Sequence, residues 1–110
     1  MAGLHLVVHG RVQGVGFRAY VKSIAEGMDL RGAVWNSRTG TVEVVVEAEE
    51  ASKLSSFVEA IQHGPGYVGR VDVTRSEINN LGPGFEIRPT ISAMSFLSVP
   101  STMSFPWRDA

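Results

Sequence analysis

The order in which strand-like and helix-like hydrophobic patterns follow one another constrains the fold of this chain more than any other feature. Alternating or continuous runs of Val and Leu predict strands, and apolar residues three or four positions apart predict helices. The predicted strands cover residues 4–9, 30–35, 41–48 and 69–74, with a further short segment at 85–88. The predicted helices cover residues 17–28 and 51–62, and Gly64-Pro65 ends the second of them.

The resulting order of strand, helix, strand, strand, helix, strand predicts an α+β, ferredoxin-like βαββαβ sandwich. We expect an antiparallel four-stranded sheet, with residues 85–88 as a candidate short fifth strand, and both helices on one face. In this topology the first two strands run parallel to each other, and the third strand lies between them.

The chain divides into one domain of residues 1–90 and a C-terminal extension of residues 91–110, whose role the sequence leaves open. Serine recurs at every third position of the extension from residue 92 to residue 104. One expectation is a poorly ordered tail. The other is that its apolar residues pack on the exposed sheet face or on a second copy, so that the protein is either a monomer or a tail-mediated dimer.

The composition narrows the class of protein. The 110 residues include no cysteine, which removes disulfides, thiolate catalysis and zinc–thiolate sites. A net charge of -1 is unlike the basic excess of proteins that bind nucleic acid or anionic membranes. We see no cationic signal-peptide start and no apolar run near the ~20 residues of a membrane span. We therefore expect a cytoplasmic protein with neither nucleic acid nor membrane as partner.

A glycine-rich loop separates the first predicted strand from the first helix. Gly10, Gly14 and Gly16 fall within seven residues, and Arg18 follows at once. Glycines allow the backbone to curl so that successive N–H groups point inward, and the helix adds its own N–H groups and positive dipole end. With the forked donors of Arg18, this describes a pocket for one phosphate group. A tight strand-to-helix turn followed by a surface arginine explains the same residues equally well.

The predicted topology places Asn36 near this loop. Asn36 ends the second strand, which is parallel to the first, so both strands end at one edge of the sheet. Two inter-strand spacings, roughly 10 Å, separate them, and an arginine side chain can cover much of that distance. We therefore expect Arg18 and Asn36 to face one small site.

Residues 10–18, GRVQGVGFR, closely resemble the acylphosphatase signature GxVQGVxFR. Residues 32–43, GAVWNSRTGTVE, are similar to the family's second segment, and Gly64-Pro65 is similar to a third. The resemblance covers about residues 4–88. One departure is that the family usually has Trp directly after the strand-two glycine. Here Ala33 takes that place and Trp35 precedes Asn36, on the same strand face as the usual position.

The resemblance implies a hydrolase that cleaves the carboxyl–phosphate bond of acyl phosphates and releases inorganic phosphate, without metal or cofactor. It implies that Arg18 binds the phosphoryl group and that Asn36 positions the attacking water. It assigns further phosphate binding to the backbone amides of Gln13, Gly14, Val15, Gly16 and Phe17.

Other readings of the same residues are weaker. Residues 14–19 match a GxGxxA dinucleotide motif, but the acid expected about 20 residues further on is absent. RNA-binding domains of this fold stack bases on strand aromatics, and strand 41–48 has none. His5 and His9 lie roughly 13 Å apart on a strand, too far to share a metal ion, and we expect them at the surface. The remaining alternative is a non-catalytic domain, either one that binds phosphate or acyl phosphate or a regulatory domain.

Overall fold

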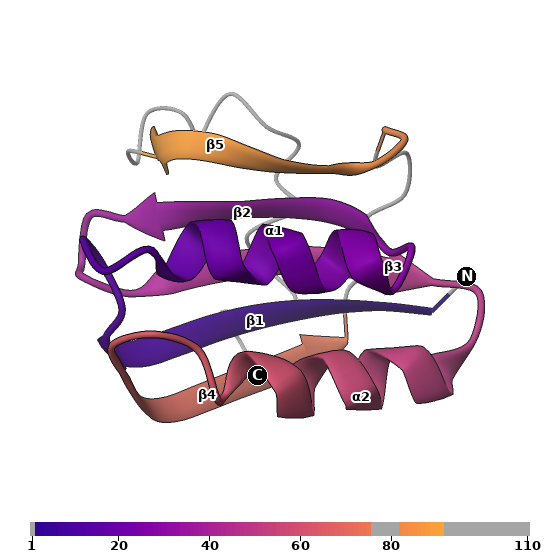
Figure 1. Ribbon diagram of the computed structural model, residues 1–110, viewed down its shortest axis with the longest axis horizontal. Coiled ribbons are helices and arrows are strands. Elements are labelled where there is room, and N and C mark those ends of the chain that lie inside the picture. The colour runs from indigo at the N-terminus through magenta and orange to yellow at the C-terminus, as the bar shows by residue number, and fades with distance from the viewer. Residues whose placement is uncertain (1, 76–81, 92–110) are drawn as a thin grey trace.

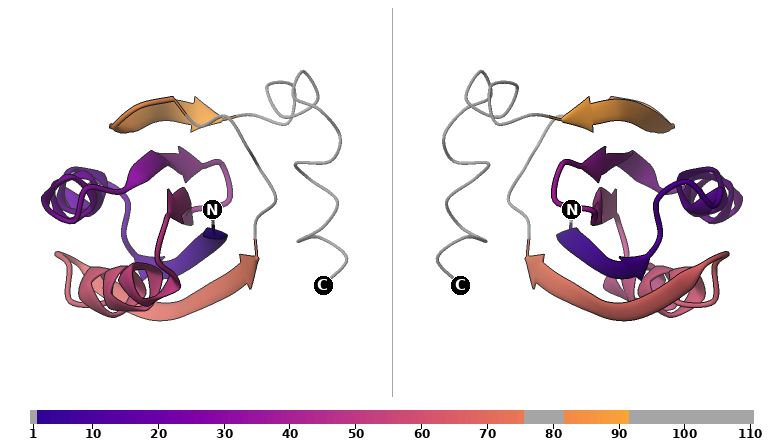
Figure 2. Two further views of the ribbon diagram at one scale, coloured as in Figure 1. Left: turned by 90° about the vertical axis from the view of Figure 1, so that its right-hand side faces the viewer. Right: turned by 90° about the vertical axis from the view of Figure 1, so that its left-hand side faces the viewer.

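Each predicted pattern forms the expected element in the computed structural model, which describes residues 2–75 and 82–91. The strands are β1 (Ala2–Arg11), β2 (Arg31–Ser37), β3 (Val42–Ala48), β4 (Tyr67–Arg75) and β5 (Phe85–Ile91), and the helices are α1 (Phe17–Gly27) and α2 (Ala51–Ile61). Both helices cover one face of a single sheet (Figures 1 and 2), which confirms the predicted α+β sandwich. Neither described helix is long and apolar enough to cross a membrane.

The strand order across the sheet is β4-β1-β3-β2-β5. β3 pairs antiparallel with both β1 and β2, so β1 and β2 run parallel with β3 between them, as predicted. The four-stranded part is antiparallel as expected, and the candidate fifth strand is present but pairs parallel with β2, so the whole sheet is mixed. The reason is that β4 ends at Arg75, opposite Leu4, and β5 begins at Phe85, opposite Gly32. Both positions lie at the edge where β1 and β2 start, so β5 runs in the direction of β2.

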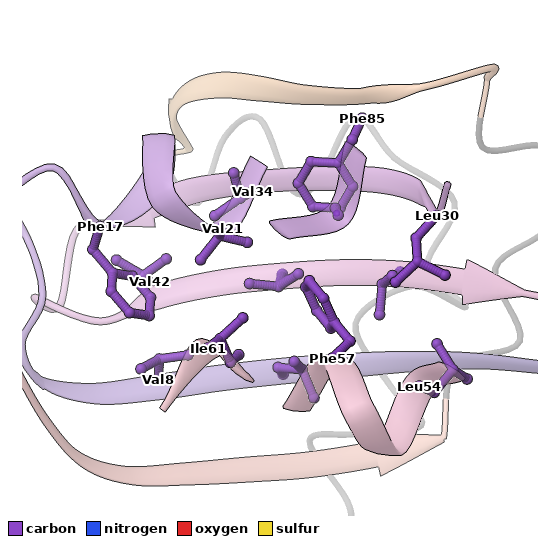
Figure 3. Close-up of a cluster of buried hydrophobic side chains, with 14 of the residues drawn as sticks. Val8, Phe17, Val21, Leu30, Val34, Val42, Leu54, Phe57, Ile61 and Phe85 are labelled. Atoms are coloured by element: carbon purple, nitrogen blue, oxygen red, sulfur yellow. The ribbon is translucent and has the colours of Figure 1, made fainter. Parts of the chain in front are cut away.

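The core lies between the helices and the sheet (Figure 3). Phe17 and Val21 of α1 and Phe57 of α2 are at most 1% exposed, as the helical spacing predicts. The ring centroid of Phe57 lies 6.4 Å from that of Phe85, so β5 contributes to the same core. β3 contributes alternate residues to this core: Val42, Val44, Val46 and Ala48.

The opposite face of the sheet carries a second apolar cluster of Ala33, Trp35 and Val45. The same face holds a buried polar pair, because the Nε2 atom of His5 lies 3.0 Å from Oε1 of Glu43 and His5 is only 2% exposed. The expectation that His5 lies at the surface is therefore wrong: it is buried on this face, where Glu43 of the neighbouring strand is its polar partner. The expectations for residues 92–110 lie outside the described residues.

Candidate active site

The ends of β1, β2 and β5 and the start of α1 meet at one edge of the sheet (Figure 1). This follows from the topology, because β1 and β5 are both parallel to β2. The residues that the sequence singled out lie along this edge: the loop after β1, the first turn of α1, and the end of β2.

The glycine-rich loop uses the backbone freedom of its glycines. Gly14 and Gly16 have φ angles of 73° and 84°, in the left-handed region that disfavours side chains. A Cβ atom at either position would meet nothing within 4 Å, so conformation rather than crowding requires glycine there. Gly16 is the N-cap of α1, and its carbonyl accepts a hydrogen bond of 3.1 Å from the backbone N–H of Tyr20.

The first turn of α1 carries the features of an anion site. It contains no acidic residue, and Gly16 provides no side-chain cap, so the positive end of the helix is not compensated locally. The first N–H groups of any α-helix have no acceptor within the helix, which leaves them available to an anion.

The segment that follows α2 packs closely against the glycine-rich loop. Gly66 has a φ of 83°, and a Cβ atom there would lie 2.1 Å from the carbonyl oxygen of Arg11 and 2.8 Å from Cγ2 of Val15. A Cβ atom at Gly64 would lie 2.8 Å from the Phe17 ring. The Gly64-Pro65 pair, predicted as a helix stop, thus also belongs to a segment that the loop packs against closely.

Arg18 is half-buried in the first turn of α1, and its Nη1 atom donates a hydrogen bond of 3.4 Å to the backbone carbonyl of Arg88 in β5. No carboxylate among residues 2–75 and 82–91 forms an ion pair with it. A guanidinium with most of its donors uncommitted is suited to bind a phosphoryl group.

Asn36 lies near the end of β2 on the helix side of the sheet, opposite Val42 in the register with β3. Its Oδ1 atom is buried and has no hydrogen-bond partner in the described part of the chain. A buried acceptor without a partner is uncommon and calls for an explanation such as a functional role. Arg88 pairs with Trp35, the residue before Asn36, so the carbonyl that Arg18 contacts lies beside Asn36 on the neighbouring strand. The sheet therefore brings the elements of Arg18 and Asn36 together.

Gln13 has a contact that sequence reasoning missed. Its side-chain Nε2 donates to the backbone carbonyls of Ser37 and Thr41, at 2.7 and 2.9 Å. The family resemblance assigns only the backbone amide of Gln13 to the site. The signal available in the sequence was an amide side chain in a glycine-rich loop, which does not identify its acceptors.

Trp35 and Ala33 share the strand face away from the helices, as the alternation of the strand predicts. The Arg88 guanidinium carbon lies 5.9 Å from the centroid of the Trp35 ring, within the range of a cation–π contact. The ring thus lies on the opposite face of the sheet from the Asn36 side chain. Among the described residues, no group of three or more His, Cys, Asp or Glu side chains is arranged to hold a metal ion.

Comparisons with known proteins agree with this geometry. The family model described as Acylphosphatase matches residues 4–87. The acylphosphatase of Azorhizobium caulinodans is 40% identical over 90 residues, which cover 80% of this chain and 96% of that protein. The crystal structure of acylphosphatase from Bacillus subtilis aligns with a TM-score of 0.75 at 39% identity, covering 80% of this chain and 99% of the other. An acylphosphatase structure from Coxiella burnetii aligns with a TM-score of 0.73 at 31% identity, covering 79% and 92%.

Proposed function

Because this chain belongs to the acylphosphatase family, it is a hydrolase that acts on acyl phosphates, and we propose that the sheet edge described above is its active site. In this proposal Arg18 and the backbone amides of residues 13–17 bind the phosphoryl group. Asn36 orients the water that attacks it. The observation that carries the proposal is the convergence of an uncompensated helix N-terminus, an arginine without a carboxylate partner and an unpartnered buried amide oxygen at one edge.

Hydrolysis of an acyl phosphate requires that the water and the phosphoryl group are held in position and that the charge on the phosphoryl oxygens is stabilised. The water oxygen forms a bond to phosphorus while the bond between phosphorus and the acyl oxygen breaks, which releases a carboxylate and inorganic phosphate. The carboxylate leaves readily, so a strong acid or a covalent nucleophile is not needed. The Asn36 amide accepts a hydrogen bond from water but does not remove its proton. That proton ends on the phosphate or on the leaving carboxylate.

The first experiment is hydrolysis of benzoyl phosphate by the unmodified protein in excess EDTA. We expect turnover to persist, because the proposed site uses amide and guanidinium donors in place of a metal ion. Inorganic phosphate should inhibit competitively, since it fits the same donors. Loss of turnover that a divalent metal restores would contradict the metal-free mechanism. Binding of phosphate without any turnover would favour a non-catalytic domain instead.

The roles of Arg18 and Asn36 can be separated by kinetics. Arg18→Ala removes a charge that holds the phosphoryl group, so both phosphate affinity and turnover should fall, with a loss of ~2–4 kcal/mol in transition-state binding. Asn36→Ala should lower kcat by a similar order while the inhibition constant of phosphate changes little. Arg75→Ala, an exposed arginine at the far edge of the sheet, is the matched control and should behave like the parent protein.

We also propose that residues 1–90 form the catalytic domain, supported by the match to residues 4–87, and that it is monomeric. A cytoplasmic location, supported by the cysteine-free composition, stays a prediction. The role of residues 91–110 stays a prediction: a poorly ordered tail, or packing of its apolar residues on the sheet face or on a second copy.

A further inference from the structure

We propose that Gln13 is a positioning residue whose side chain holds the phosphate-binding loop in register with Asn36. This inference rests on the function proposed above and adds to it a residue that acts through its side chain, apart from any backbone contact with phosphate. Gln13 lies in the loop directly before Gly14, and one of its two acceptors, the carbonyl of Ser37, belongs to the residue directly after Asn36.

The contacts of Gln13 are specific. Its side-chain NH₂ group has two hydrogens, and the two acceptors at 2.7 and 2.9 Å can use both. The two acceptors are backbone carbonyls on either side of the turn between β2 and β3. Ser37 is the last residue of β2, and Thr41 directly precedes β3. The backbone N–H of Ser37 in turn donates to the Thr41 carbonyl at 2.9 Å. Gln13 therefore ties the loop to both sides of the turn that joins β2 to β3.

The turn to which Gln13 donates has several hydrogen bonds of its own. The hydroxyl oxygen of Ser37 lies 2.6 Å from that of Thr41 and 2.9 Å from that of Thr39. The backbone N–H of Thr39 also donates to the Ser37 hydroxyl at 3.3 Å. Ser37, at the centre of this cluster, is only 8% exposed, whereas Thr41 is half-buried and Thr39 is exposed. A turn held by several mutual hydrogen bonds is a rigid anchor for the loop.

The consequence for catalysis follows from geometry. In-line attack needs the water and the phosphoryl group at a fixed separation, and a misplacement of about 1 Å can cost about 100-fold in rate. The loop amides and Arg18 hold the phosphoryl group, whereas Asn36 holds the water from another element. Gln13 is the side chain that ties the backbone of the first to the backbone of the second. Without it, phosphate still finds its donors, but the separation is no longer held.

The test is steady-state kinetics with benzoyl phosphate, together with inhibition by inorganic phosphate. Gln13→Ala should lower kcat by about 10- to 100-fold while the inhibition constant of phosphate changes less than about threefold. Gln13→Asn keeps the amide but shortens the arm, and it should also lower kcat. Gln62→Ala, which removes an exposed glutamine bonded within α2, is the matched control and should keep the parental kcat. Thermal melts of each variant identify the temperature at which all are folded.

The double variant Gln13→Ala/Asn36→Ala distinguishes a positioning role of Gln13 toward Asn36 from a merely structural role. If Gln13 acts by placing Asn36, the double variant should turn over no more slowly than Asn36→Ala alone. Effects that multiply would overturn the proposal, as would parental kcat in Gln13→Ala and Gln13→Asn. If Gln13→Ala fails to fold, Gln13→Asn takes its place in both comparisons. Multiplying effects or a parental kcat would contradict the role of Gln13 but would leave the proposed function unchanged. An inactive parent protein or a fully active Asn36→Ala would overturn the proposed function, and the role of Gln13 with it.

Discussion

Replacing Gly16 by alanine tests the conformation on which the anion site depends. Gly16 has a φ of 84°, and an added methyl group would meet nothing within 4 Å. The cost is therefore conformational, about 1–2 kcal/mol for an L-residue held in the left-handed region. The lower entropy of the unfolded alanine chain offsets roughly 0.4–1 kcal/mol of this. A net loss of about 1 kcal/mol corresponds to a melting temperature lower by roughly 5 °C.

Gly27→Ala is the matched control, because the chemical change is the same in an ordinary helical conformation. Gly27 is the last residue of α1, its φ is not positive, and a methyl group there also meets nothing within 4 Å. Alanine should raise stability by about 0.5–1 kcal/mol there, so the two variants shift the melting temperature in opposite directions.

The same pair of variants reports on the site. If Gly16→Ala turns even one loop amide away from phosphate, the loss of a hydrogen bond to a charged group, about 1.5–3 kcal/mol, weakens phosphate inhibition at least about tenfold. Gly27→Ala should leave inhibition unchanged. Thermal melts and phosphate inhibition of benzoyl phosphate hydrolysis measure both effects. Equal or stabilising shifts for the two variants would refute a left-handed Gly16, and unchanged inhibition in Gly16→Ala would refute a site built on the loop amides.

Three further predictions concern stability. Phe57→Ala should cost about 3–5 kcal/mol in urea denaturation, because the ring is fully buried against Phe85; a cost below about 1 kcal/mol would contradict its place in the core. The hydrogen bond from His9 lowers the pKa of Asp72, so this carboxylate stabilises the fold while ionised, and the contribution is lost as the pH falls through its pKa. Asp72→Asn should therefore lower the melting temperature at pH 5 but not near pH 2, and an equal effect at both would argue against the pair. Deletion of residues 92–110 should lower the melting temperature, and an unchanged melting temperature with an unchanged mass in solution would exclude packing of the extension on the sheet.

Local patterns in the sequence were sufficient for much of the fold. The periodicity of residues 17–28 and 51–62 predicted both helices, because the spacing of apolar residues directly states which face is buried. The parallel arrangement of β1 and β2 follows from the order of elements, and this order alone predicts that Arg18 and Asn36 lie at one sheet edge. The left-handed Gly14 and Gly16 were also accessible, since glycine spacing reports backbone freedom at the residue itself.

Only the tertiary structure decided which partners these residues meet. The direction of β5 depends on where β4 ends across the whole sheet, and the burial of His5 depends on Glu43, 38 positions away. The acceptors of Gln13 lie 24 and 28 positions further along the chain, in a turn whose sequence does not indicate which residue will donate to it. A residue's pattern specifies its own backbone and the face it presents. The atoms that meet that face are set by the packing of all the elements together, and for this reason the geometry of the site is a property of the folded sheet.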